Sequence, residues 1–265
     1  MAADDDLLGT YRGLFDGVAA AYVDGRPGYP DELWRRLAEL DALTAGCRLL
    51  EIGPGGGQAT GPMLDAGASI VAVELGDDFA DVLRRRHAGR PLEVLVGPFE
   101  SVDLPGEPFD LVAAATSFHW VPTEVGLARA AGALRPDGVL ALWWNVFGDP
   151  DRPDPFHEAF APLATRLAPS PPEAGAHPYA LRTEERIAEI SAAGFDDIEV
   201  TRLSWTGRHS PAGLRAMFAT FSPILALEEP DRTEVLDGIE RLAAEEFGGV
   251  VERPYLTMLY TAVRR

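Results

Sequence analysis

The stretch Leu49-Leu50-Glu51-Ile52-Gly53-Pro54-Gly55-Gly56-Gly57-Gln58-Ala59-Thr60 decides the fold of this chain of 265 residues. An apolar run enters a glycine-rich turn, and a helix-like segment follows the turn. Glycines permit a positive φ and let a ligand approach the backbone without a Cβ in its path. The stretch therefore predicts a strand, a turn and a helix that bind a nucleotide-like ligand.

Short apolar runs alternate with helix-like segments around this stretch, a pattern typical of βαβ units and a mainly parallel sheet. The predicted strands are Arg48–Ile52, Ile70–Glu74, Leu92–Val96, Leu111–Ala115 and Val139–Trp144. The predicted crossover helices are Ala59–Ala66, Asp78–His87 and Val125–Leu134. Spaced apolar residues predict two earlier helices, one over Thr10–Val23 and one that starts at Asp31.

Residues 148–178 are rich in proline and predict an irregular covering segment with one helix, marked by Phe156, Phe160 and Leu163. The elements expected after it are a helix Thr183–Ala193, a strand Ile198–Trp205, helices Ser210–Phe221 and Asp231–Phe247, and a strand Tyr255–Val263. Met217, Phe218 and Phe221 have helical spacing and are interpreted as core residues, with a pocket wall as the alternative.

We expect one α/β domain over residues 1–265. Its parts are an N-terminal helical cap (1–41), a cofactor-binding Rossmann-like core (42–147) and C-terminal strands with lid insertions (148–265). The predicted fold is a Rossmann-like, seven-stranded, mostly parallel sheet flanked by helices.

The chain is strongly acidic, with 42 Asp and Glu, 23 basic residues and a formal charge of −19. This charge opposes the counterion release that drives most nucleic-acid binding, so we expect no nucleic-acid partner. Arg84 to Arg86 lack interleaved aromatic residues and are interpreted as a solvated helix face. Every basic residue is an arginine, which excludes Schiff-base chemistry and a Walker-type lysine.

Cys47 is the single cysteine, so the chain can form no internal disulfide and no cysteine cluster for zinc. Cys47 opens a predicted strand and is interpreted as a core residue. No metal site is predicted. The N-terminus lacks a signal-peptide pattern, and no apolar run is long enough to span a bilayer. We therefore expect a cytoplasmic protein without a membrane partner.

Two carboxylates distinguish between possible ligands. Glu51 lies two residues before the first glycine of the turn, where it would suit an ammonium group better than a phosphate. Glu74 ends the second strand, about 20 residues after that glycine, where a carboxylate can accept bonds from ribose hydroxyls. Together they favour a ribose-containing ligand with an ammonium group over a dinucleotide.

With these residues the chain resembles the class I S-adenosylmethionine-dependent methyltransferases, and it is similar to the trans-aconitate methyltransferase-like small-molecule enzymes. The likeness begins at Tyr22-Val23-Asp24-Gly25-Arg26-Pro27-Gly28-Tyr29-Pro30. It implies S-adenosylmethionine as cofactor and S-adenosylhomocysteine as product. It also implies the cofactor-binding residues Tyr22, Arg26, Glu51, Gly53, Pro54, Gly55, Gln58, Glu74, Leu75, Phe99, Glu100, Thr116 and Ser117.

Ligands of open α/β sheets bind beyond the carboxyl ends of the strands. The fourth strand leads into Thr116-Ser117-Phe118-His119-Trp120, and the fifth ends in Trp143-Trp144-Asn145. Trp143 and Trp144 should point to opposite faces of the sheet. His119 is the candidate catalytic base, with substrate contact as the alternative role. The expected substrate-binding residues are His119, Trp120, Trp144, Asn145 and His177.

The resemblance implies methyl transfer to a small organic molecule by in-line displacement. It favours O-methylation, with a carboxylate acceptor ahead of a hydroxyl, and a carboxylate requires no base. Two alternatives stay open. The protein could bind S-adenosylmethionine as a regulator or for a non-methylating reaction. A nicotinamide-dependent oxidoreductase is the less favoured alternative. The sequence does not indicate the oligomeric state.

Overall fold

A computed structural model describes residues 25–164 and 178–265. The predicted helix Thr10–Val23 lies outside these residues, as do two predicted site residues, Tyr22 and His177.

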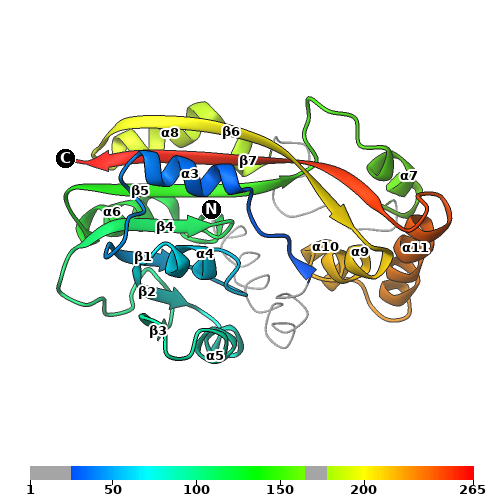
Figure 1. Cartoon of the computed structure of the whole chain (residues 1–265), viewed down its shortest axis with the longest axis horizontal. Coiled ribbons are helices and arrows are strands. Elements are labelled where there is room, and N and C mark those ends of the chain that lie inside the picture. The colour runs from blue at the N-terminus through cyan, green and yellow to red at the C-terminus, as the bar shows by residue number, and fades with distance from the viewer. Residues whose placement is uncertain (1–24, 165–177) are drawn as a thin grey trace. The chain divides into compact units, whose positions relative to one another are not determined.

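Within the described residues, seven strands form one sheet in the order β3-β2-β1-β4-β5-β7-β6 (Figure 1). Their bounds are β1 Arg48–Ile52, β2 Ser69–Glu74, β3 Leu92–Val96, β4 Phe109–Ala115, β5 Leu134–Phe147, β6 Phe195–His209 and β7 Val251–Arg264. Strand β1 pairs in parallel with β2 and β4, β2 with β3, and β4 with β5. Figure 1 shows β7 running opposite to β5 and β6. The predicted Rossmann-like fold class is confirmed.

Helices connect and flank these strands. Their bounds are α3 Asp31–Glu39, α4 Thr60–Asp65, α5 Asp77–Arg86, α6 Thr123–Ala133, α7 Pro155–Ala164, α8 Thr183–Ala192, α9 Pro211–Phe218, α10 Ser222–Leu225 and α11 Asp231–Glu245. Two short 3-10 helices are η1 Phe118–Trp120 and η2 Tyr179–Leu181. Within the described part of the chain, none of the helices has the length and apolar composition needed to cross a membrane.

The predicted helix Ser210–Phe221 is present as α9 but ends three residues earlier, at Phe218, and a separate helix α10 that was not predicted follows it. The Ser210 hydroxyl caps the start of α9 by accepting a bond from the backbone N–H of Gly213, at 3.0 Å. At the other end the Thr220 hydroxyl donates to the Met217 carbonyl at 2.6 Å. Phe221 then has extended backbone, with φ −84° and ψ 133°, and so separates α9 from α10.

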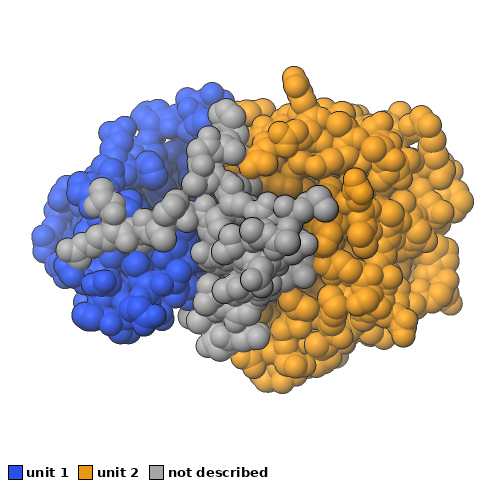
Figure 2. Space-filling view, turned by 180° about the vertical axis from the view of Figure 1, so that it is seen from behind, with its two compact units in different colours: residues 1–27, 146–177, 204–256 blue, residues 28–145, 178–203, 257–265 orange. Residues whose placement is uncertain are grey.

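The chain divides into two compact units, blue and orange in Figure 2. Unit 1 contains residues 1–27, 146–177 and 204–256, and unit 2 contains residues 28–145, 178–203 and 257–265. The boundaries near residues 146, 204 and 257 fall inside β5, β6 and β7. The expected partition of a single domain at residues 41 and 147 stays a prediction.

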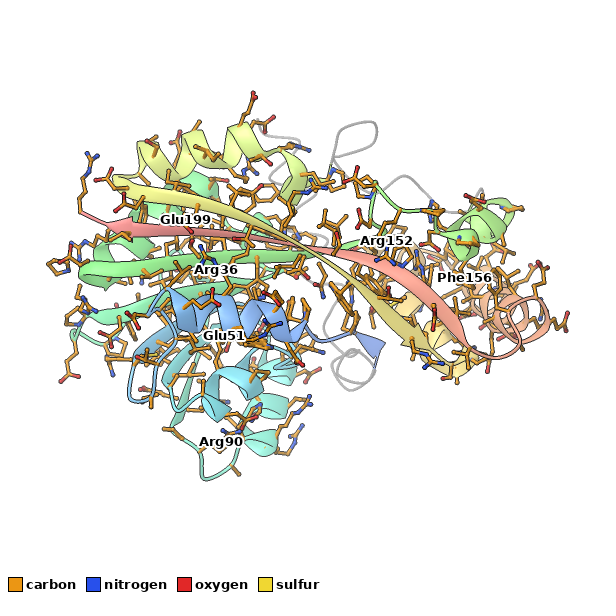
Figure 3. The ribbon with its side chains drawn as sticks, turned by 45° about the horizontal axis from the view of Figure 1, so that its top comes forward. Arg36, Glu51, Arg90, Arg152, Phe156 and Glu199 are labelled. Carbon is orange, nitrogen blue, oxygen red and sulfur yellow. The ribbon has the colours of Figure 1, made fainter. Side chains whose placement is uncertain are left out.

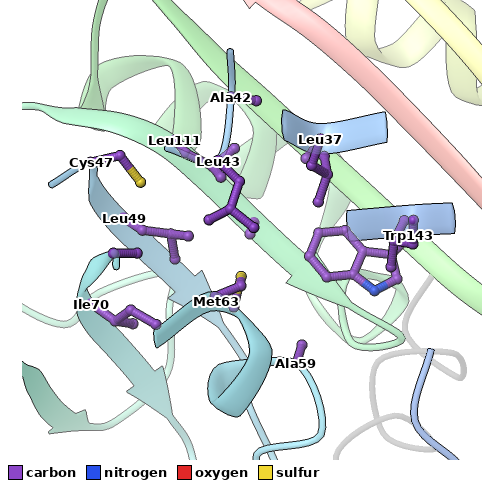
Figure 4. Packing of buried hydrophobic residues seen from close by; sticks show 14 of the residues in the cluster. Leu37, Ala42, Leu43, Cys47, Leu49, Ala59, Met63, Ile70, Leu111 and Trp143 are labelled. Atoms are coloured by element: carbon purple, nitrogen blue, oxygen red, sulfur yellow. The ribbon is translucent and has the colours of Figure 1, made fainter. Parts of the chain in front are cut away.

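The core of unit 2 lies between α3, α4 and the sheet (Figure 4). Helix α3 contributes Leu33 and Leu37, which are four residues apart and therefore on one helix face. They pack in one cluster with Leu49 of β1 and Trp143 of β5. Cys47, 6% exposed, belongs to the same cluster, so its predicted core role is confirmed.

The core of unit 1 is built by α7, α9 and α11. Met217 and Phe218 of α9 are buried there, and Phe221 packs against the cluster, so the core interpretation of these residues is confirmed. A buried ion pair joins Arg253 of β7 to Asp154, with the Arg253 Nη2 atom 2.6 Å from Oδ2 of Asp154. The guanidinium of Arg253 also lies over the ring of Phe156, which is labelled in Figure 3.

Candidate functional site

The glycine-rich turn follows β1 and has a shape that other residues could not adopt without strain. Gly53, Gly55 and Gly57 have φ values of 63°, 53° and 80°. A Cβ placed on Gly53 would lie 2.7 Å from the Cβ of Ser117, far inside van der Waals contact. Pro54 is buried and Gln58 is half-buried within the turn. The turn, called the cradle below, therefore requires glycine at these positions.

Glu51 lies on β1, directly before this cradle, and is labelled in Figure 3. Its side chain is 0% exposed. The Oε2 atom accepts a bond from the Thr60 hydroxyl at 2.7 Å, whereas Oε1 has no hydrogen-bond partner within the described residues. Burial raises the pKa of Glu51 to about 8, and the nearby charge of Glu74 acts in the same direction. A buried carboxylate of this kind is complemented by a cation.

Glu74 ends β2 and reaches the same cradle. Its Oε2 atom accepts a bond from the backbone N–H of Gly55 at 2.9 Å, and Oε1 accepts one from Gly76 at 3.1 Å. The parallel register of β1 and β2 pairs Ile52 with Val73, which brings the ends of the two strands together. The two carboxylates that the sequence singled out therefore lie at one edge of the sheet.

The segment after β3 adjoins this edge. The backbone N–H of Gly97 donates to the Glu74 carbonyl at 2.9 Å. Phe99 is buried under the guanidinium of Arg129, 5.6 Å from its ring centroid, and Glu100 is half-buried. Leu75 is 43% exposed next to Glu74. Leu75 and Glu100 are thus accessible beside Glu74, whereas Phe99 is buried, and the ligand contacts of all three stay predictions.

Two arginines contact this region without having been predicted to do so. Arg86 of α5 donates from Nη1 to the Gly56 carbonyl at 3.1 Å, and Arg129 of α6 donates to the Val102 carbonyl. Arg84 to Arg86 are exposed, as their interpretation as a solvated face requires. The contact of Arg86 with the turn was not predicted, because a run of three arginines does not indicate which backbone carbonyl one of them will bind.

The residues after β4 close the cradle from the other side. Thr116 has a φ of 58°, a strained conformation for a β-branched residue. Its hydroxyl shares a hydrogen bond of 3.0 Å with the hydroxyl of Tyr29. The Ser117 hydroxyl donates to the Ile52 carbonyl at the end of β1. Thr116 and Ser117, both predicted cofactor residues, therefore lie at the same edge as Gly53.

His119 follows in η1 and accepts a hydrogen bond at Nδ1 from the indole Nε1 of Trp144, at 3.0 Å. Its ring centroid lies 4.9 Å from that of Trp120 and 6.0 Å from that of Tyr179. The structure thus brings together three of the predicted substrate-binding residues, His119, Trp120 and Trp144. Their roles toward a substrate, and the role of His119 as a base, stay predictions.

Trp143 and Trp144 point to opposite faces of the sheet, as predicted. The ring of Trp143 packs edge-on against Tyr29 and Trp34, at 5.9 and 6.0 Å. Trp144 lies among Tyr179 and Tyr260, at 5.3 and 6.1 Å. The contacts of Trp143 belong to the core of unit 2, whereas Tyr179, which Trp144 contacts, also faces His119.

Tyr179 and Arg186 also belong to this group of side chains, and no sequence pattern had marked them as site residues. Arg186 of α8 lies over the ring of Tyr179, 3.7 Å from its centroid, and pairs with Glu189 at 2.7 Å. The Tyr260 hydroxyl donates to the Ala180 carbonyl at 2.7 Å, which fixes η2 next to Trp144.

Asn145 and Arg26 bind other residues of the protein through hydrogen bonds and ring contacts. The amide of Asn145 donates to the Gly28 carbonyl at 2.9 Å and accepts from the Thr257 hydroxyl at 2.7 Å. Within unit 1, Arg26 donates from Nε to the Thr220 hydroxyl at 2.7 Å and lies over the rings of Phe147 and Phe221. These contacts are structural, and the predicted ligand contacts of Asn145 and Arg26 stay predictions.

Comparison with known proteins agrees with this geometry. A family described as "Methyltransferase domain" matches residues 50–142, a range that holds the glycine-rich turn, Glu74 and His119. The chain is similar to an uncharacterized methyltransferase of Schizosaccharomyces pombe, with 27% identity over 92% of this chain and 94% of the relative.

Two further similar proteins have descriptions that state a reaction or a bound ligand. A malonyl-[acyl-carrier protein] O-methyltransferase of Geobacter sulfurreducens is 31% identical over 76% of this chain and 77% of its own length. The crystal structure of an S-adenosylmethionine-dependent methyltransferase from Thiobacillus denitrificans, in complex with S-adenosyl-L-homocysteine, has a TM-score of 0.52. It is 19% identical and covers 91% of this chain and 94% of that one, so it supports the fold.

Proposed function

The chain belongs to the S-adenosylmethionine-dependent methyltransferases, and on this premise we propose that it methylates an oxygen of a small organic molecule, a carboxylate ahead of a hydroxyl. S-adenosylmethionine is its cofactor. When bound, this cofactor supplies a methyl group that its sulfonium makes electrophilic.

The residues at the edge of the sheet fit such a cofactor. The buried Oε1 atom of Glu51, which has no hydrogen-bond partner among residues 25–164 and 178–265, suits the cofactor's ammonium group. The carboxylate of Glu74 suits the two ribose hydroxyls. We assign the methionyl portion to Gly53, Pro54, Gly55 and Gln58. Leu75, Phe99 and Glu100 would border the adenine, and Thr116 and Ser117 would close the site.

The observation that supports methyl transfer at this site is the aromatic group around His119. Trp120, Trp144 and Tyr179 form an apolar wall there, and a displacement reaction is favoured where the reactants are positioned and water is excluded. The relative from Geobacter sulfurreducens is an O-methyltransferase that acts on a malonyl group. The nucleophilic oxygens of a malonyl group are those of its carboxylate, so this relative supports the same acceptor chemistry here.

The charge of −19 supports a small substrate over a nucleic acid. We propose no membrane partner and a cytoplasmic location, both from the sequence.

The first experiment is a calorimetric titration with S-adenosylmethionine, S-adenosylhomocysteine and the nicotinamide dinucleotides. We expect saturable binding of the first two alone. Glu74→Gln should weaken it by roughly ten- to hundredfold, because the variant loses hydrogen bonds to a charged group. Glu93→Gln is the matched control, since Glu93 lies on the neighbouring strand β3 and is exposed.

The second experiment follows the methyl group from labelled cofactor into panels of small carboxylic acids and alcohols. Base-labile methyl esters are the expected products. Binding of a dinucleotide would overturn the cofactor assignment. Methyl ethers or methylamines as the only products would overturn the choice of a carboxylate.

A further inference from the structure

We propose that Trp144 is a positioning residue that fixes His119 as a hydrogen-bond donor, so that His119 binds an oxygen of the methyl acceptor and does not remove its proton. The proposal rests on the proposed function and assigns a role to one contact of the site.

The donor and the acceptor in this hydrogen bond follow from the chemistry of the two rings. An indole N–H is a donor and has no acceptor capacity. The atom that faces it, Nδ1 of His119 at 3.0 Å, must therefore carry a lone pair. A neutral imidazole has one lone pair in the ring plane, so its proton is on Nε2. A proton on Nδ1 would set two N–H groups against each other.

The indole itself is held firmly. Trp144 is 4% exposed and is packed between Tyr179 and Tyr260. The Tyr260 hydroxyl donates a hydrogen bond to the Ala180 carbonyl, and the ring of Tyr179 lies under the guanidinium of Arg186. Because both neighbours are fixed, the indole cannot easily turn away from His119, and the tautomer is set by the fold.

This arrangement separates the two roles considered for His119. A general base needs a lone pair that can reach the substrate, and the lone pair of His119 is engaged by Trp144. The protonated Nε2 can instead donate a bond to an oxygen. Catalysis then requires an acceptor that is nucleophilic without losing a proton.

A carboxylate meets this requirement. One of its oxygens forms a C–O bond to the methyl carbon, the C–S bond breaks, and its electron pair stays on sulfur. The negative charge of the carboxylate and the positive charge of the sulfonium cancel. No proton is released, so the reaction balances without a base.

The test reads the tautomer directly, without cofactor or acceptor, and so does not depend on the proposed function. The full-length protein is labelled with ¹⁵N-histidine, and His119→Gln identifies the His119 signals by their loss. We expect a protonated Nε2 and an unprotonated Nδ1. Trp144→Phe removes the N–H but keeps a ring, and it should shift the tautomer ratio roughly five- to tenfold, the effect of one hydrogen bond.

Trp143→Phe is the matched control. The Nε1 atom of Trp143 is buried without a hydrogen-bond partner in the described part of the chain, so its removal should leave the His119 signals unchanged. A protonated Nδ1 in the unmodified protein would overturn the proposal even if Trp144→Phe failed to fold. An unchanged tautomer ratio in folded Trp144→Phe would also overturn it.

Activity gives a second readout once an acceptor is known. Glutamine can donate an N–H but cannot act as a base, so His119→Gln should keep activity within roughly tenfold of the unmodified enzyme. His119→Ala should lose roughly ten- to hundredfold, mainly through a higher KM, because it lacks the donor. Equal loss in both variants, by the roughly 10²- to 10⁴-fold of a missing base, would overturn the proposal.

Discussion

Replacing Gly53 with alanine should destabilise the protein through backbone strain and through a steric clash with Ser117. The φ of 63° costs a residue with a Cβ about 1–2 kcal/mol. The new Cβ would lie 2.7 Å from the Cβ of Ser117, and overpacking of this kind costs about 1–3 kcal/mol. Together the two effects predict a loss of about 2–5 kcal/mol.

Gly46→Ala separates the two effects. Gly46 has a φ of 85°, but a Cβ there would meet no atom within 4 Å. Its substitution should therefore cost only the backbone strain, about 1–2 kcal/mol. In a Ser117→Gly background the atoms that block Gly53 are gone, so Gly53→Ala should cost no more than Gly46→Ala.

Urea unfolding followed by circular dichroism measures the free energy of unfolding of Gly53→Ala, Gly46→Ala, Ser117→Gly and the double variant Gly53→Ala/Ser117→Gly. Calorimetry measures the affinity of the same four variants for S-adenosylhomocysteine. We expect Gly53→Ala to weaken binding and Gly46→Ala to leave it unchanged. Equal free energies of unfolding for Gly53→Ala and Gly46→Ala would refute the reasoning. So would a cost of Gly53→Ala that does not fall in the Ser117→Gly background.

Two other predictions concern buried ionisable side chains. Glu51 has a pKa of about 8 in the folded state and of about 4.5 in the unfolded chain. The stability that this group contributes is therefore complete below pH 4.5 and is lost as the pH rises toward 8. Urea unfolding across this range should show the decline, and Glu51→Gln should flatten it whereas Glu93→Gln should not. Asp154→Asn leaves the guanidinium of Arg253, 2% exposed, without its partner and should cost about 3–5 kcal/mol in the same assay. Glu252→Gln, in an exposed pair, should cost less than about 1 kcal/mol, and an equal cost would contradict the burial argument.

The cradle was predictable because its determinants are local or follow from strand direction. Glu51 and the glycines are neighbours in sequence, and parallel pairing of β1 with β2 brings Glu74 to the same edge. Ser117 was placed there for the same reason, since β4 pairs in parallel with β1.

The contacts that could not be predicted depend on side-chain directions across the fold. The bond from Arg86 to the Gly56 carbonyl requires the exact end of α5, and the bond from Trp144 to His119 requires two rotamers. The predicted end of this helix was three residues late because no glycine or proline directly follows Phe218 to mark the end of α9.

Because Cys47 is buried, the reactivity of its thiol can be used to measure local unfolding. It is the single cysteine of the sequence, and burial raises the pKa of its thiol, so the folded core resists alkylation. A thiol reagent reaches the sulfur only when the packing around α3 and β1 opens, and the labelling rate then measures the free energy of that opening. A compound that binds only the folded form slows the labelling as its concentration exceeds its Kd. Acceptor candidates can therefore be ranked by protection of one thiol, before any methylated product has been identified.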